Sequence, residues 1–196
     1  MKTLISSFVP FAGRRTNLSQ QAMARLKKRY STKQWKEWGV SFVTLPVAFA
    51  AVQKRLNELL QEKYDYIIMS GENRRARKVL VERVALNVAH ASLADNDGHK
   101  AHLAPVTTKG PLALMTSVDT EQIVHQMRRQ SIPARTNHHA GTFVCNASFY
   151  RALQIQKKTI FLHLPGRMAA DKLKRTHVER LADCLELAWM TTVVGE

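Results

Sequence analysis

The chain has 196 residues, a formal net charge of +15 and only two cysteines, Cys145 and Cys184. This length suits a single domain over residues 1–196 whose core needs no disulfide framework, and two cysteines suit a reducing cytoplasm. No apolar run approaches the roughly 20 residues of a membrane-spanning helix, so we expect a cytoplasmic protein that does not enter a membrane.

The excess of basic residues raises the question of a nucleic-acid or polyanion partner. Arginines and lysines cluster along the chain, but no helix-turn-helix, zinc-finger or RNA-recognition signature accompanies them. Aromatic residues make up 7% of the chain, too few to predict a platform for base stacking. A solvated basic surface without a specific partner is the alternative, and specific nucleic-acid binding is not expected.

Strands and helices alternate through the first seventy residues. Residues 3–8 and 39–45 are short apolar segments typical of strands. Asn17 is placed to cap a helix that runs to about residue 29. Apolar spacing predicts a second helix over residues 48–60, and residues 65–70 form a third apolar strand.

The middle of the chain is less regular. Residues 79–93 indicate extended structure, although the choice between strand and helix stays open there. Glycines and prolines recur in residues 95–111, which predicts a long loop or hairpin. Asp119 is placed to cap a helix that ends near residue 130, and a strand is expected over residues 134–139.

The last third contains a helix over residues 143–155, a strand over residues 159–165 and an amphipathic helix from Lys172 onward. Trp189 and Met190 of this last helix are a candidate contact between subunits. The alternation of strands and helices predicts an α/β fold, a three-layer α/β/α sandwich with a mostly parallel central sheet.

Cys145 is the first candidate for a catalytic side chain. Ala140 and Gly141 permit a tight turn, and Thr142 is placed to cap the helix that follows. Cys145 would then lie in the first helical turn, where backbone N–H groups and the helix dipole stabilise a thiolate. The alternative is an inert buried thiol, since free cysteines are among the most buried residue types.

A cysteine nucleophile needs an imidazole to accept its proton and later to protonate the leaving group. His138 and His139 are near in sequence but could simply end a strand. His163 shares one face of the expected strand over residues 159–165 with Phe161 and lies at its carboxyl end, where sites of open α/β sheets gather. A core histidine bonded to the backbone is the alternative.

The imidazole in turn needs a carboxylate to fix its tautomer and stabilise its charged form. Glu82 has apolar residues on both sides, and a carboxylate buried in such a run must be paired or hydrogen-bonded. An exposed Glu82 bridged to a surface arginine is the alternative. Asp95 is a second candidate, but its place before Asn-Asp-Gly is typical of a turn.

Six motifs, in order, resemble the pyroglutamyl peptidase I family of cysteine peptidases, also called pyrrolidone-carboxylate peptidases. They are SFVPFAGRRTN, LPVAF, VERVALN, ADNDG, AGTFVCN and FLHLP. Together they cover nearly the whole chain up to about Pro165. An ordered set of six motifs is far more specific than any one of them.

The resemblance implies a triad with Cys145 as nucleophile, His163 as general base and acid, and Glu82 as the group that orients the imidazole. The implied reaction removes an N-terminal pyroglutamyl residue from blocked peptides through a thioester, without metal or cofactor. Homodimers or homotetramers are frequent in the family. The side chains implied to surround the lactam ring are Phe8, Phe11, Val47, Leu93, Phe143 and Val144.

Two regions depart from the family pattern. Ser92 stands where the family has an arginine thought to stabilise the oxyanion, and loss of one such donor typically lowers the rate about a hundredfold to a thousandfold. The family's small, Gly/Ala-rich loop is replaced after Gly71 by the basic sequence ENRRARK. Three hypotheses stay open: a working pyroglutamyl peptidase, a member with weakened or altered activity on another N-terminally blocked substrate, and a non-enzymatic basic polyanion-binding protein.

Overall fold

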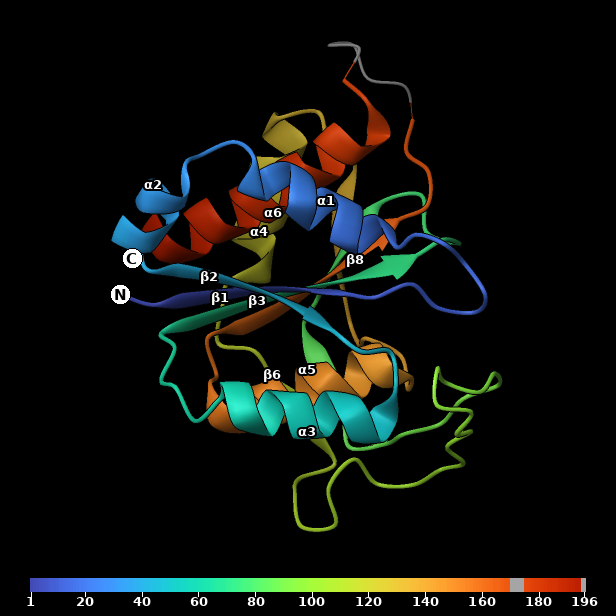
Figure 1. Ribbon diagram of the computed structural model, residues 1–196. Coiled ribbons are helices and arrows are strands. Elements are labelled where there is room, and N and C mark those ends of the chain that lie inside the picture. The colour runs from blue at the N-terminus through green and yellow to red at the C-terminus, as the bar shows by residue number, and fades with distance from the viewer. Residues whose placement is uncertain (170–174, 195–196) are drawn as a thin grey trace.

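The computed structural model describes residues 1–169 and 175–194, and its centre is a six-stranded sheet (Figure 1). The strands of this sheet are β1 (Thr3–Phe8), β2 (Val40–Leu45), β3 (Tyr66–Asn73), β4 (Val79–Glu82), β7 (Ala134–Asn137) and β8 (Thr159–Pro165). Their order is β2-β1-β3-β8-β4-β7. All neighbours pair in parallel except β4 and β8, so β4 and β7 run against the other four strands.

Helices cover both faces of the sheet (Figure 1). One face carries α1 (Leu18–Lys27), α2 (Thr32–Glu37), α4 (Thr120–Arg129) and α6 (His177–Val194). The other face carries α3 (Phe49–Leu59) and α5 (Val144–Ile155), with a small antiparallel pair, β5 (Val84–Leu86) and β6 (Ala113–Met115), beside α5. The predicted three-layer sandwich with a mostly parallel sheet is confirmed. Among the described residues, no helix is both long and apolar enough to cross a bilayer.

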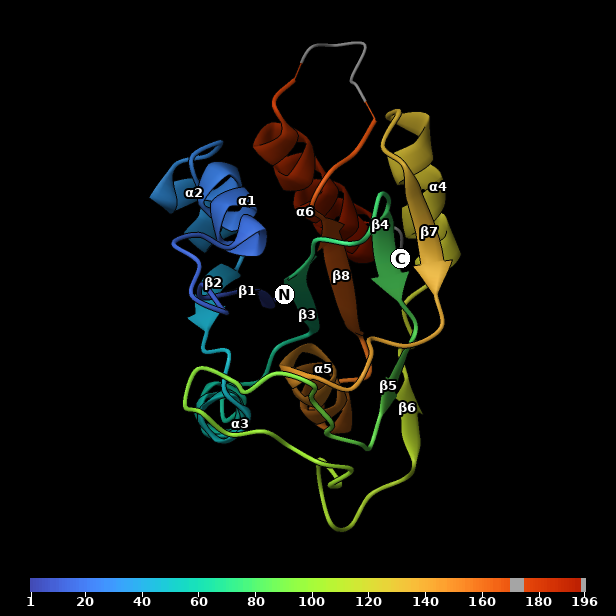
Figure 2. The same cartoon turned by 90° about the vertical axis from the view of Figure 1, so that its right-hand side faces the viewer.

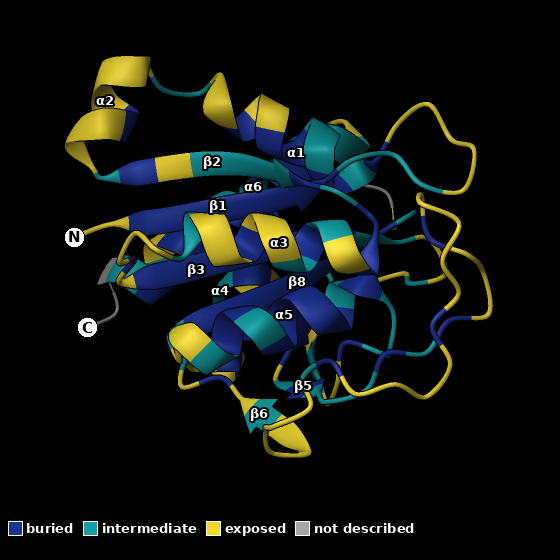
Figure 3. Ribbon diagram, turned by 60° about the horizontal axis from the view of Figure 1, so that its bottom comes forward, coloured by how far each residue is buried: buried dark blue, intermediate teal, exposed yellow. Residues whose placement is uncertain are grey.

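The central strands are apolar because both of their faces are covered. Every residue of β1 and β8 is buried, and Figure 3 shows these strands as buried bands behind α3 and α5. Along β8, Ile160, Leu162 and Leu164 pack beneath α1, α4 and α6, whereas Phe161 packs beneath α3 and α5. The predicted alternation of this strand is therefore confirmed.

Several element boundaries differ from the sequence-based expectations. α2 was not predicted, although Ser31 and Gln34 form a capping box at its start. β3 continues through Gly71 to Asn73, because these last residues pair with the end of β8. The final helix begins at His177; Lys172, where a helix was expected to start, lies outside the described residues.

Residues 79–93, for which strand and helix were both open, contain two short strands with different partners. β4 completes the central sheet, and β5 leaves it to pair with β6. In β8, His163 lies between Gly71 of β3 on one side and Leu80 of β4 on the other. In this antiparallel register Glu82, the last residue of β4, pairs with Phe161, two residues before His163.

Asn146 joins α5 to the segment that follows β4. Its side chain is fully buried, and Asn146 Nδ2 donates to the Leu86 and Val88 carbonyls at 2.8 and 3.0 Å. Asn146 Oδ1 accepts from the Leu86 N–H at 2.8 Å. Since Asn146 directly follows Cys145, these three bonds also fix the first turn of α5.

Replacing Asn146 by alanine is expected to lower the free energy of unfolding by about 2 kcal/mol or more, because buried backbone groups lose their partners. Urea denaturation followed by circular dichroism measures this change. Asn57→Ala is the matched control, since among the described residues its side chain accepts one exposed bond, from Arg151. Equal stabilities of the two variants would contradict the structural role of Asn146.

Candidate active site

A cavity of about 690 Å³ opens where β1, β3 and β8 reach their carboxyl ends. Figure 2 turns the carboxyl ends of β1 and β2 towards the viewer. Glu82, Cys145 and His163 all line this cavity. Five of the apolar residues named from the sequence line it as well: Phe8, Phe11, Val47, Leu93 and Phe143.

Glu82 and His163 form a buried hydrogen-bonded pair. Glu82 Oε1 lies 2.7 Å from His163 Nδ1, and Asn137 Nδ2 donates to Glu82 Oε2 at 2.9 Å. Glu82 is fully buried and His163 nearly so. In the antiparallel register of β4 and β8, Glu82 faces Phe161, two residues from His163, which places the two side chains within diagonal reach. The buried carboxylate thus has partners for both oxygens.

The surroundings of His163 raise its pKa. Burial lowers the pKa of the imidazole, but hydrogen bonds with Cys145 and Glu82 and electrostatic attraction to both groups outweigh this effect. The net result raises the pKa of His163 to about 10. His163 is therefore held as an imidazolium at neutral pH, beside the sulfur of Cys145.

Cys145 is the second residue of α5, and Phe143 is the N-cap residue of this helix. The predicted capping role of Thr142 is wrong, because its hydroxyl donates instead to the His90 carbonyl at 2.9 Å. The first hydrogen bond of the helix runs from the Ala147 N–H to the Phe143 carbonyl. The N–H groups of the first turn, including that of Cys145, therefore have no acceptor inside the helix and can serve an oxyanion.

Gly71 lies directly against the sulfur of Cys145. A Cβ atom at this position would come within 3.0 Å of Cys145 Sγ and 2.9 Å of the Phe161 ring. From the sequence, Gly71 was expected only to follow a strand and to precede the basic loop. The sequence does not show that Gly71 pairs with His163 in the sheet, and this pairing places it at the site.

The apolar wall of the cavity is built from loops and from the start of α5. The Phe143 ring lies 5.0 Å from that of Phe11 and 5.4 Å from that of Phe49, centroid to centroid. Leu93 is 61% exposed and lies at the mouth. Val144, the sixth residue named for the ring, is fully buried in the core cluster beneath α3 and α5.

Asp95 and His139, the alternative candidates for the carboxylate and the histidine of the site, bond to backbone N–H groups. Asp95 Oδ2 accepts from the Phe49 N–H at 2.8 Å and Oδ1 from the Asp97 and His99 N–H groups, so this carboxylate organises a turn and the start of α3. His139 lines the cavity, and its Nδ1 accepts from the Gly141 N–H at 3.2 Å. Glu82 is thus the carboxylate bonded to His163.

The sequence model of the pyroglutamyl peptidase family matches residues 1–173. A pyrrolidone-carboxylate peptidase of Thermococcus kodakarensis is 33% identical over 200 aligned positions, which cover 96% of this chain and 94% of that protein. A second, from Vibrio vulnificus, is 28% identical and covers 100% of this chain and 94% of its own. The crystal structure of pyrrolidone carboxyl peptidase from Thermus thermophilus matches with a TM-score of 0.82 at 26% identity, over 95% of this chain and 98% of that one.

A sheet-edge cavity with a cysteine, a histidine and a carboxylate is typical of a cysteine hydrolase. The chain belongs to the pyroglutamyl peptidase family. It is accordingly a hydrolase of the peptidase class, with peptides as substrates. Nothing in these comparisons supports the alternative of a non-enzymatic polyanion-binding protein.

The raised pKa of His163 predicts a histidine signal that titrates near pH 10 in NMR spectra of ¹⁵N-labelled protein. In Glu82→Gln, the midpoint is expected to fall, because the attraction to the Glu82 carboxylate is lost while burial, which lowers the pKa, remains. His90→Gln and His139→Gln assign the signals of the two other histidines that line the cavity. An unchanged midpoint in Glu82→Gln would contradict the control of His163 by Glu82.

Proposed function

We propose that the chain hydrolyses the peptide bond after an N-terminal pyroglutamyl residue, through a thioester on Cys145. The observation that carries the proposal is the 2.7 Å contact between Glu82 and His163, with Cys145 hydrogen-bonded to the same imidazole. All three side chains line one cavity with an aromatic wall. Membership of the family supplies the substrate, since its relatives are pyrrolidone-carboxylate peptidases.

The proposed reaction has two steps. Cys145 Sγ attacks the carbonyl carbon, and as the C–N bond breaks, His163 gives its proton to the departing amine. A water molecule then attacks the thioester; His163 takes a proton from this water, and the sulfur leaves as thiolate. Glu82 remains a carboxylate throughout and holds the imidazolium in place.

The oxyanion of each step requires donors at the floor of the cavity. The Cys145 N–H in the first turn of α5 is the candidate donor, assisted by the positive end of the helix dipole. Ser92, which replaces the arginine expected from the resemblance, lines the cavity. A rate lower than that of relatives with this arginine is therefore compatible with the proposal.

The lactam ring is neutral and compact, so apolar walls with a few polar groups suit it. Phe11, Phe143 and Val47 offer such walls beside Cys145. A pyroglutamyl residue has no free amine, and recognition therefore depends on shape and not on a charged anchor.

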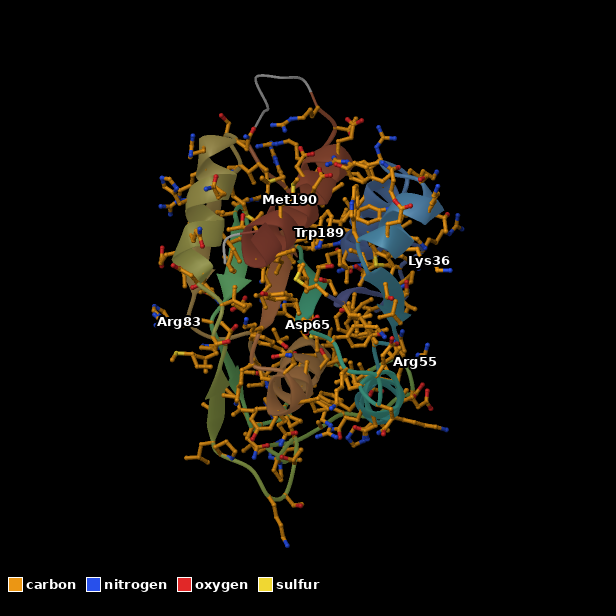
Figure 4. All side chains as sticks on the ribbon, turned by 90° about the vertical axis from the view of Figure 1, so that its left-hand side faces the viewer. Lys36, Arg55, Asp65, Arg83, Trp189 and Met190 are labelled. Carbon is orange, nitrogen blue, oxygen red and sulfur yellow. The ribbon has the colours of Figure 1, made fainter. Side chains whose placement is uncertain are left out.

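The assembly state is a separate part of the proposal, in which the chain forms a homodimer or homotetramer as its family resemblance implies. Met190 is 46% exposed on α6 and is available for such a contact, whereas Trp189 packs inward on Trp35 at 5.3 Å and Trp38 at 5.6 Å (Figure 4). Of the two residues named from the sequence, Met190 is the one that fits an intersubunit contact.

Wild-type protein is expected to release fluorophore from pyroglutamyl-7-amido-4-methylcoumarin, whereas Cys145→Ala loses activity by a factor of at least about ten thousand, as for other nucleophile deletions. Cys184→Ala is the matched control, since Cys184 is buried in α6, on the face of the sheet opposite to α5 and Cys145. Absence of turnover in the wild type, or equal turnover in Cys145→Ala, would contradict the proposed function.

A further inference from the structure

We propose that the enzyme prefers peptides with an acidic residue soon after the pyroglutamyl residue, and that Arg75 is the main determinant of this preference. The inference rests on the proposed function and adds a substrate class to it. The residues involved lie on the turn between β3 and β4 and on the loop after β1.

The turn that carries Arg74 and Arg75 is well fixed. Asn73 Oδ1 accepts from the N–H groups of Arg75 and Ala76, both at 3.2 Å. The Gly166 N–H donates to the Asn73 carbonyl at 3.2 Å, and a Cβ atom on Gly166 would lie only 2.8 Å from Arg74 Cα. The end of β8 therefore holds the backbone of this turn in place at the cavity.

Glu72 anchors two further guanidinium groups at the same rim. Its side chain is 6% exposed, and its Oε2 accepts from the Leu18 N–H at 2.8 Å. Its Oε1 pairs with Arg74 and, at 3.4 Å, with Arg14. One buried carboxylate thus serves two arginines, which leaves positive charge in excess.

The charges that line the cavity do not balance. Three arginines, Arg14, Arg74 and Arg75, line it together with two carboxylates, of which Glu82 is taken by the imidazolium of His163. Within the part of the chain that the structure describes, the guanidinium of Arg75 forms no ion pair and is exposed. A cavity with walls of one net sign concentrates ligands of the opposite charge, so an anionic substrate group fits here.

The position of this charge suits the part of the substrate that leaves. Gly71 lies against Cys145 Sγ, and Arg74 begins the turn three residues later, about 10 Å along the chain at the spacing of a strand. A volume of about 690 Å³ belongs to the range that holds ligands larger than one lactam ring. With the ring against Phe11 and Phe143, the next residues of the peptide have room near Arg75.

By the resemblance drawn from the sequence, the basic turn departs from the small, Gly/Ala-rich loop expected at this place. The ring pocket and triad account for removal of a pyroglutamyl residue without it. A substrate preference is therefore the property that we expect the turn to add.

The test compares kcat/KM for two peptides that differ only in the residue after pyroglutamate, glutamate in one and glutamine in the other. Wild-type protein at low salt is expected to favour the glutamate peptide by at least about fivefold, with the ratio decreasing as salt screens the charges. Arg75→Gln is expected to bring the ratio close to one. Arg55→Gln, on α3 and outside the lining of the cavity, is the control for a surface arginine and should keep the wild-type ratio.

A neutral coumarin amide measured beside the two peptides separates this inference from the proposed function. Turnover of the amide with a wild-type peptide ratio near one would contradict the acidic preference and leave the proposed function standing. A ratio that persists in Arg75→Gln would contradict the role of Arg75. If neither the amide nor the peptides are hydrolysed, both proposals fail.

Discussion

The buried hydrogen bond between Glu82 and His163 is the interaction on which the site depends. A buried carboxylate is costly unless it is paired, and His163 and Asn137 together occupy both of its oxygens. The reversed strand β4 makes this contact possible, because its antiparallel register with β8 sets Glu82 diagonally opposite His163. The single antiparallel junction of the central sheet is therefore also the junction that orients the imidazole.

Much of the fold could be predicted because its strongest signals are local. Buried strands such as β1 and β8 appear as short apolar runs, and Asn17 caps α1 as expected, with its Oδ1 accepting from the Ser19 N–H. α2 escaped prediction because this six-residue helix buries only Trp35. Residues 79–93 stayed ambiguous because β4 and β5 are defined by partners far away in sequence, β8 and β6.

The site shows the same division between local and distant information. Cys145, His163 and Glu82 could be named from local patterns and an ordered resemblance, but their supporting contacts could not. Gly71 beneath the sulfur and Asn137 beside Glu82 act across the sheet, the latter over 55 positions. The mistaken capping role of Thr142 has the same cause, since a tertiary bond to the loop at His90 takes its hydroxyl. The positive charge of the turn after Gly71 could be read from the sequence. Its position at the cavity could be known only from the structure.

The central claim is that Cys145 carries the pyroglutamyl group as a thioester. His163 donates and accepts the proton, and Glu82 holds the imidazolium in place. The most direct measurement is an acid quench during turnover of an activated pyroglutamyl ester, followed by mass spectrometry of the digested protein. The account predicts a pyroglutamyl adduct on the peptide that contains Cys145 and none on the peptide that contains Cys184. Continued turnover without an adduct on Cys145, and undiminished in Cys145→Ala, would contradict it.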